Sequence, residues 1–281
     1  MMTMGSKPAG KPLAVVTGAS SGIGLELAKT CADEGFNLVV ASDDGHIDAP
    51  AGFFRERGAE VVSLETDLST EEGRARLIDA IGDRPVDALL ANAGIGLAGG
   101  FLDQDFRDAR KVIDTNIVGT VALVHEIGVR MRSRGQGKIL ITGSIGGYVP
   151  GSYHAVYNAT KAFLNNFAAA LRDELKETGV TVTCLMPGPT ETNIFDRAGF
   201  QGTKAEQLKK DDPAFVAKVG FDAMMKGDGD VVAGWKSKLI TAAANVTPSS
   251  VWRPSTGAAR NPDPRKIEGV TLCAQLSRSS L

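Results

Sequence analysis

Short apolar runs alternate with helical patterns along most of this chain, and no other feature of the sequence constrains its fold as strongly. The first run ends at a glycine-rich turn, and the alternation continues to about residue 233. Short runs of this kind are typical of strands that are buried on both faces of a sheet. The expected strands are 13–16, 38–41, 61–64, 88–91, 138–142, 180–185 and 231–233.

The segments between these runs have helical patterns. The expected helices cover 22–34, 51–57, a stretch that begins near Ser69 or Thr70, 103–133, 154–177 and 213–226. Strands that alternate with helices imply right-handed crossovers and a parallel sheet. The sequence therefore predicts the α/β class, with a single doubly wound parallel sheet of about seven strands and helices on both faces.

The domain organisation follows from the same pattern. No polar linker interrupts the series, so we expect one domain over 12–245, preceded by a flexible tail at 1–11. Residues 246–281 hold four of the twelve prolines and show no sustained period, which predicts an irregular or disordered tail. An arm that packs on a partner subunit is the alternative for this segment.

Charge and cysteine content narrow the possible functions. The chain has 31 Lys and Arg against 33 Asp and Glu, a net charge of −2, which argues against a nucleic-acid partner. The three cysteines are far apart and form no CxxC pair or His/Cys cluster, so we expect no metal site and no disulfide framework. A reducing, cytoplasmic location fits this cysteine content best.

No membrane-spanning segment is expected. The longest stretch without Asp, Glu, Lys or Arg is 139–160, and several glycines and Pro150 break it. A membrane span needs about 20 mostly apolar residues.

A glycine-rich turn between the first strand and the first helix predicts a dinucleotide site. Backbone N–H groups at a helix N-terminus attract anions, and glycine lets a pyrophosphate approach them closely. Gly18 and Gly22 would allow this approach, and Gly24 would let the helix pack close to the strand. The residues expected to contact the cofactor here are Gly18, Ser20, Ser21, Gly22, Ile23 and Gly24.

Four further motifs follow strands or lie in helices in a fixed order. They are Asn92-Ala93-Gly94, Ser144, Tyr157-Asn-Ala-Thr-Lys161, and Pro187-Gly188-Pro189-Thr190-Glu191-Thr192. With the TGxxxGxG loop, they make the chain resemble the short-chain dehydrogenase/reductase family over about 12–245. The resemblance implies a Rossmann-like fold and an oxidoreductase that uses NAD or NADP.

The resemblance also implies how the rest of the cofactor is held. Asp67, with Leu68, would contact the adenine, and Asn92, Ala93 and Gly94 would lie close to the adenosine ribose. Pro187, Gly188, Thr190 and Thr192 would flank the nicotinamide. Residues 193–211 are long enough to form a substrate lid.

Tyr157 and Lys161 are four residues apart, so they share one helix face. An ammonium near a phenol lowers the pKa of the phenol, which would let Tyr157 act as general acid or base. By resemblance, Lys161 would also bind the nicotinamide ribose. His154, three residues before Tyr157, is interpreted as a surface or capping residue.

Two more side chains complete the expected catalytic set. Ser144, at the carboxyl edge of the sheet, would stabilise charge on the substrate oxygen. It is not expected to be a covalent nucleophile, because the local sequence Gly143-Ser144-Ile145-Gly146-Gly147 lacks the Gly-x-Ser-x-Gly pattern and no His partner can be assigned. Asn116 is a poor residue for the middle of a helix and predicts a local distortion. By resemblance, Asn116 holds a water that links Lys161 to solvent.

The choice between NAD and NADP depends on the residues after the second strand, Ser42, Asp43 and Asp44. A carboxylate there accepts ribose hydroxyls and repels a 2′-phosphate. The family's usual NAD pattern would place Asp at Ser42, and its usual NADP pattern would place Arg at Asp43; this chain has neither. No Lys or Arg occurs from 38 to 54, so the sequence favours NAD, with Asp43 as the determinant.

The predicted function is hydride transfer between nicotinamide and a small-molecule alcohol or carbonyl substrate. A catalytically idle dinucleotide-sensing scaffold and a nucleotide-sugar epimerase or dehydratase are the alternatives. The complete set of Asn116, Ser144, Tyr157 and Lys161 disfavours a scaffold. An epimerase or dehydratase usually has TGxxGxxG and a longer C-terminal substrate domain. Neither is expected in this chain, which disfavours that alternative. Tyr148, Tyr153, Ile194, Phe195 and Phe200 suggest an apolar substrate wall, unless they only pack.

A homodimer or homotetramer is expected. Family members commonly pair the two long helices, 103–133 and 154–177. In the second helix, an apolar stripe runs through Phe163, Phe167, Ala170 and Leu171. The alternative is that this stripe faces the subunit's own sheet.

Overall fold

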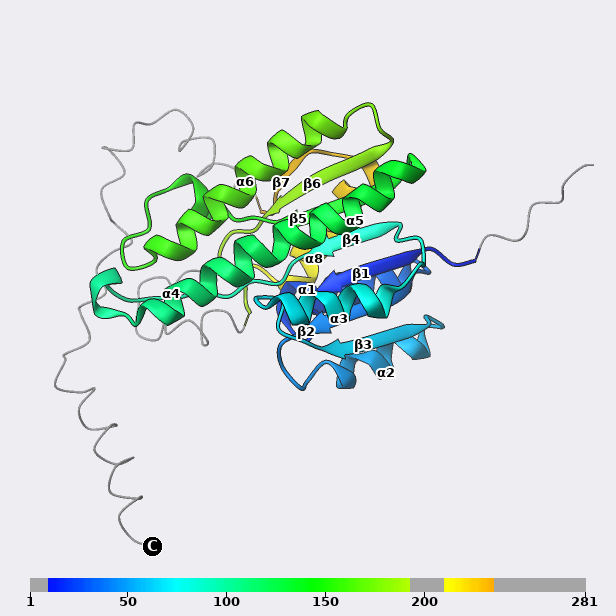
Figure 1. Cartoon of the computed structure of the whole chain (residues 1–281), viewed down its shortest axis with the longest axis horizontal. Helices are drawn as coiled ribbons and strands as arrows, with labels where there is room; N and C mark the ends of the chain where they lie inside the picture. The colour runs from blue at the N-terminus through cyan, green and yellow to red at the C-terminus, as the bar shows by residue number, and fades with distance from the viewer. Residues whose placement is uncertain (1–9, 193–209, 235–281) are drawn as a thin grey trace, which may run out of the picture.

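The computed structural model describes residues 10–192 and 210–234, which form a seven-stranded parallel sheet between two layers of helices (Figure 1). Each predicted strand is confirmed, with ends that differ by no more than one residue. The strands are β1 Leu13–Thr17, β2 Asn37–Ser42, β3 Val61–Glu65, β4 Ala88–Ala91, β5 Gly137–Thr142, β6 Val180–Met186 and β7 Asp230–Val232.

The strand order is β3-β2-β1-β4-β5-β6-β7. The chain therefore starts in the middle of the sheet, moves outward to β3, crosses back to β4 and moves outward again to β7. The loops after β1 and β4 leave the sheet in opposite directions, which opens a crevice at their carboxyl ends. The doubly wound prediction is confirmed, and its switch point is where a ligand is expected.

Helices cover both faces of the sheet, as predicted (Figure 1). On one face of the sheet, α1, α2 and α8 pack onto strand residues such as Val16, Leu90 and Leu140. On the other face, α3, α5 and α6 pack onto residues such as Val15 and Leu89. Consecutive strand residues thus point into different cores, because side chains alternate along a strand. The helices are α1 Gly22–Asp33, α2 Asp48–Glu56, α3 Glu71–Ile81, α4 Phe106–Ile113, α5 Thr120–Arg134, α6 Ala155–Leu175 and α8 Pro213–Lys226.

The helical stretch predicted over about 103–133 begins later in the structure than expected, and it contains the distortion expected at Asn116. The α-helix begins only at Phe106, because the Asp105 side chain caps it by accepting a hydrogen bond from the backbone of Arg107. A π-helical segment, η2 (Asp114–Gly119), then separates α4 from α5. The local distortion expected from Asn116 is therefore present, and π-helical turns of this kind are frequent at functional sites.

The combined stretch Phe106–Arg134 is long and apolar enough, by length and composition alone, to cross a membrane. In this fold, 44% of its most apolar window is buried. It packs against β4, β5 and α6, and this packing accounts for those of its apolar side chains that are buried.

Parts of the predicted organisation lie outside the described residues. These are 1–9, 193–209 and 235–281, which include most of the two tails and of the lid segment. The limits of a single domain over 12–245 stay a prediction.

Candidate active site

Glycines shape the loop that joins β1 to α1. Gly18 and Gly22 have φ values of 67° and 56°, which favour glycine because a side chain strains that conformation. A Cβ on Gly24 would lie 2.0 Å from the backbone oxygen of Gly18. Only glycine at position 24 therefore lets α1 begin this close to the end of β1.

The N-terminus of α1 is open to an anion. Within the described part of the chain, its N-cap residue Ser21 makes no side-chain cap, and the first turn carries no acidic residue. By contrast, Thr70, Asp105 and Asp212 each cap their own helix with a side-chain oxygen. The N–H groups of α1 thus retain the positive end of the helix dipole for a pyrophosphate. This loop fits a dinucleotide.

Asn92 fastens three strand ends together. The backbone N–H groups of Asn92 and Ala93 both donate to Thr17 Oγ1, each at 3.0 Å. Asn92 Nδ2 donates to the Thr17 backbone oxygen at 3.2 Å, and Thr142 Oγ1 donates to Asn92 Oδ1 at 3.1 Å. Sequence analysis missed this structural role; the signal was a threonine at the end of each neighbouring strand.

A pocket of about 440 Å³ lies beside the carboxyl ends of β2 and β3 and contains Asp43 and Asp67. Its other lining residues, which the sequence did not indicate, are Glu65, Thr66 and Arg76. Burial raises the pKa of Asp67, but hydrogen bonds from Ser69 and the nearby Lys111 outweigh it, so the pKa lies below its ordinary value. The pocket is therefore acidic at neutral pH.

The predicted neighbours of this pocket have different environments. The side chain of Leu68 is buried in the core, so only its backbone is available to a cofactor. Ser42 Oγ donates to Ser20 Oγ at 2.9 Å, and Ser20 Oγ donates to Asp44 Oδ2 at 3.0 Å. Asp44 thus joins the glycine loop, whereas Asp43 is exposed and lines the pocket.

The structure brings Ser144, Tyr157 and Lys161 together between the end of β5 and α6. The side chains of Ser144 and Tyr157 are hydrogen-bonded. Lys161 Nζ donates to the backbone oxygen of Thr142 at 2.8 Å and lies 5.8 Å from the centre of the Tyr157 ring. The lysine side chain is only 4% exposed. Three of the four expected catalytic side chains therefore form one cluster.

Electrostatics in this cluster contradict one prediction. Burial raises the pKa of Tyr157 to about 12, and the hydrogen bond with Ser144 offsets only part of this effect. Burial also lowers the pKa of Lys161 to about 8. The expected lowering of the Tyr157 pKa by Lys161 is wrong in this geometry, because the ammonium donates to Thr142 and desolvation dominates. At neutral pH, the phenol is protonated and Lys161 remains mostly charged.

Asn116 is fully buried beside this cluster. Its Nδ2 donates to the Ile95 backbone oxygen and to Thr160 Oγ1, each at 3.0 Å, and its Oδ1 accepts from the Ile95 backbone at 2.8 Å. A Cβ on Gly94 would lie 3.2 Å from Asn116 Oδ1 and 3.5 Å from Lys161 Nζ. Asn116 thus holds the loop after β4 against Lys161, and its contact with a water stays a prediction.

The loop after β6 connects the catalytic cluster to the glycine loop. The backbone of Ile145 donates to the Pro187 oxygen at 3.1 Å. Thr190 Oγ1 donates to the Gly188 oxygen at 2.9 Å. Thr192 lies against Gly22, where a Cβ would be 2.9 Å from its methyl carbon. The predicted nicotinamide loop therefore lies between the other two parts of the site.

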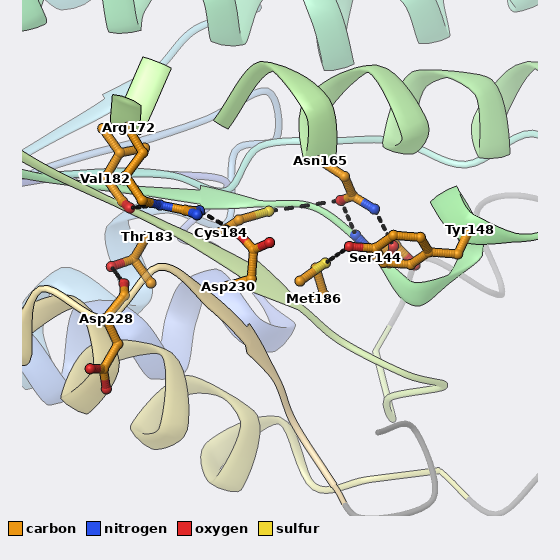
Figure 2. Close-up of polar contacts among 10 residues, drawn as sticks. All are labelled: Ser144, Tyr148, Asn165, Arg172, Val182, Thr183, Cys184, Met186, Asp228 and Asp230. Atoms are coloured by element: carbon orange, nitrogen blue, oxygen red, sulfur yellow. Dashed lines mark hydrogen bonds and ion pairs between the residues drawn. The ribbon is translucent and has the colours of Figure 1, made fainter. Parts of the chain in front are cut away.

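The aromatic residues proposed as a substrate wall have separate roles. Tyr148 donates its hydroxyl to Met186 Sδ at 3.2 Å and packs on the core (Figure 2). The Tyr153 backbone oxygen accepts a hydrogen bond from the Gly99 backbone at 2.8 Å, which joins the loop after β4 to the loop before α6. His154 is at the N-cap of α6 without a side-chain cap there, and burial lowers its pKa. Ile194, Phe195 and Phe200 lie outside the described residues.

Comparisons with known proteins agree with this arrangement. Residues 12–201 match the family model described as short chain dehydrogenase. An uncharacterized oxidoreductase of Myxococcus xanthus is 31% identical over 243 residues, which are 85% of this chain and 94% of that protein. A very-long-chain 3-oxoacyl-CoA reductase of Podospora anserina is 35% identical over 176 residues, 60% of this chain and 52% of that protein.

Solved structures are similar over most of the chain. A short-chain dehydrogenase from Sphingobium yanoikuyae in complex with NADPH has a TM-score of 0.75 at 27% identity, covering 89% of this chain and 99% of that one. A short-chain dehydrogenase/reductase from Burkholderia phymatum in complex with NAD has a TM-score of 0.75 at 25% identity, covering 84% and 92%.

Proposed function

The chain belongs to the short-chain dehydrogenase family and is an NAD(P)-dependent oxidoreductase, and from this premise we propose that it reduces a small carbonyl compound or oxidises the matching alcohol. The observation that carries the proposal is the hydrogen bond between Ser144 and Tyr157, with the buried Lys161 ammonium 5.8 Å from the centre of the Tyr157 ring. This arrangement holds one proton donor and one hydroxyl at the same point, where a carbonyl oxygen could bind.

Tyr157 is the proposed proton donor. With a pKa of about 12, its phenol is protonated throughout the neutral range and can give its proton to an oxygen that becomes an alkoxide. The nicotinamide, when bound, supplies the hydride to the carbonyl carbon or removes it from the alcohol. For oxidation, the same oxygen would accept the alcohol proton as the phenolate.

Ser144 is the proposed stabiliser of the substrate oxygen. Its Oγ accepts a hydrogen bond from the Gly146 backbone at 3.0 Å. The hydroxyl hydrogen is thereby left for the Tyr157 oxygen or for the substrate. A donor that is already oriented in the ground state stabilises developing negative charge without further reorganisation.

Lys161 and Asn116 are proposed to supply the next proton. Lys161 would bind the nicotinamide ribose and, as an ammonium, return a proton to Tyr157. Asn116 would hold the water that links Lys161 to solvent. The close approach of Gly94 to both side chains supports this arrangement.

A cofactor preference for NAD is proposed from the acidic pocket. Three carboxylates, Asp43, Glu65 and Asp67, line it against one guanidinium, Arg76. A 2′-phosphate adds negative charge and would be repelled there, whereas ribose hydroxyls can donate to a carboxylate.

We expect Asp43→Asn to reduce the preference for NADH over NADPH roughly tenfold, because a 2′-phosphate carries up to two charges and one charge pair at ~4 Å in water is worth about 1 kcal/mol. The measurement is the ratio of kcat/KM with NADH and with NADPH. Asp48→Asn, which removes a carboxylate that does not line the pocket, should leave the ratio unchanged. A wild type that strongly prefers NADPH would contradict the assignment.

The proposed activity is tested by incubating the protein and a reduced nicotinamide with a panel of ketones and aldehydes while cofactor absorbance is followed. Loss of absorbance that depends on the carbonyl compound supports a reductase. Tight cofactor binding without turnover of any compound would instead support the idle scaffold.

A homodimer or homotetramer is proposed from exposed apolar side chains. Phe167 and Leu171 pack on the subunit's own core, so the predicted stripe serves that core in part. Phe163 stacks on Phe167 but is 43% exposed, and Phe106 and Val118 on neighbouring helical segments are also exposed.

If these side chains form the subunit interface, light scattering at micromolar concentration should give a dimer or a tetramer. Phe163→Glu should then shift the protein toward monomer, because a carboxylate would be buried at the contact. A monomeric wild type would show that this surface has no such role.

A cytoplasmic location is proposed as well. Cys31 and Cys184 are free and buried, which fits a reducing compartment.

A further inference from the structure

The buried side-chain amide of Asn165 forms hydrogen bonds with both the backbone N–H and the backbone oxygen of Ser144 (Figure 2). Asn165, on α6, is 6% exposed. Its Nδ2 donates to the Ser144 backbone oxygen at 2.9 Å, and its Oδ1 accepts from the Ser144 backbone nitrogen at 3.3 Å. One side chain thus holds the peptide groups on both sides of the Ser144 hydroxyl.

The loop after β5 leaves space for this amide. A Cβ on Gly143 would lie 2.1 Å from Asn165 Oδ1, and a Cβ on Gly147 would lie 2.6 Å from Asn165 Nδ2. On a third side, Cys184 Sγ is 3.8 Å from Asn165 Oδ1. Both glycines are therefore explained by the position of one side chain, and that side chain cannot be enlarged or moved without disturbing the loop.

The amide also shares a helix face with the catalytic pair. Tyr157, Lys161 and Asn165 follow each other at intervals of four residues, so they point to the same side of α6. The pairing of β5 with β6 ends at Thr142, two residues before Ser144. Beyond that point, the bonds to Asn165 connect Ser144 to the helix that carries its two partners.

We propose that Asn165 is a positioning residue for the reaction, which fixes the Ser144 hydroxyl relative to Tyr157; this rests on the proposed role of Ser144. A polar side chain at a buried position next to the core would be replaceable by an apolar one if it only filled space. Its two bonds instead set the orientation of Ser144, whose hydroxyl is the proposed stabiliser of the substrate oxygen. Catalysis is sensitive to displacements of this kind, because the donor must lie where charge develops.

The test is a double-mutant cycle in which kcat for carbonyl reduction is measured. Asn165→Ala should lower kcat roughly tenfold or more in the wild-type background, and by less than about twofold in Ser144→Ala, since a positioning residue acts only through its target. The Kd for NADH should stay within about threefold of wild type. Asn166→Ala is the matched control: it removes an exposed amide from the next position of α6 and should leave kcat unchanged.

A second variant, Asn165→Asp, tests the same proposal in case Asn165→Ala does not fold. Asn165→Asp keeps the size of the side chain and an acceptor for the Ser144 nitrogen, but replaces the donor to the Ser144 oxygen. Asn165→Asp should lower kcat as Asn165→Ala does in the wild-type background. In the Ser144→Ala background, it should change kcat by less than about twofold.

The inference is overturned if kcat falls equally in both backgrounds, which would indicate general damage to the fold, or if Asn165→Ala and Asn165→Asp keep full kcat. A different result affects the proposed function instead. If Ser144→Ala alone keeps full activity, the assigned role of Ser144 is wrong, whatever Asn165 does.

Discussion

Tyr157→Phe is expected to lower kcat for carbonyl reduction by about 10²–10⁴-fold, the range for loss of a positioned general acid. The substitution removes one oxygen and keeps the ring, so the packing of α6 should be preserved. Steady-state kinetics should show the loss in kcat, and titration of the protein with NAD should show little change in Kd. Circular dichroism and Tm would establish that the variant is folded.

Tyr148→Phe is the matched control for this loss. It removes a phenol oxygen from the same region, but that oxygen donates to Met186 Sδ and not to Ser144. Its kcat should stay close to wild type. If Tyr157→Phe also kept near-full activity, the proton donor would have to be another group, and His154 would be tested first.

Lys161→Ala is expected to reduce both turnover and cofactor affinity. We expect a loss of at least ~10²-fold in kcat, because the proton return and the charge beside the phenol disappear together. The Kd for NAD should rise about tenfold through loss of the proposed ribose contact, about the effect of one charged hydrogen bond. Lys138→Ala, which removes a half-buried lysine that donates to the Met225 backbone oxygen, should change neither quantity.

The double variant Tyr157→Phe/Lys161→Ala should lose little more kcat than the worse single variant. Both side chains act in one proton transfer, and the effects of residues that act as a unit are not additive. If the loss in kcat of the double variant equalled the product of the two single losses, Tyr157 and Lys161 would not act in the same proton transfer.

Lys161 also predicts how stability depends on pH. Its ordinary pKa is 10.5 and its pKa in the fold is about 8, so the unfolded chain binds more protons between these values. The contribution of Lys161 to the free energy of unfolding should therefore rise as pH rises from about 8 to 10.5. The difference in Tm between wild type and Lys161→Ala, measured across this range, should shift in favour of wild type.

Most of the fold could be predicted from the sequence because the five central strands of the sheet are largely buried on both faces. Runs such as Ala88–Ala91 have no polar face to obscure them, so their ends were located to within a residue. The long helix was harder, because the cap at Asp105 and the π-helical turn around Asn116 depend on local geometry. The sequence indicates that turn only through Asn116, a poor residue for the middle of a helix.

The candidate site was predictable where spacing along one element determines which residues meet. Tyr157 and Lys161 share a helix face by their spacing alone. The expected direction of the Tyr157 pKa shift is wrong, because burial is a property of the packed fold and raises the pKa more than the hydrogen bond with Ser144 lowers it. Asn165 could not be linked to Ser144, because the two are 21 residues apart and meet only when α6 packs beside the end of β5.

Hydride transfer is tested most directly with reduced nicotinamide that carries deuterium at C4. The protein would be incubated with each C4 epimer of the labelled cofactor and with a ketone that it consumes, and the alcohol product would be analysed by mass spectrometry and NMR. The account predicts deuterium at the carbinol carbon from one epimer and none from the other, with the loss of cofactor equal to the alcohol formed. Alcohol formed without deuterium from either epimer, or cofactor consumed without any alcohol, would contradict it.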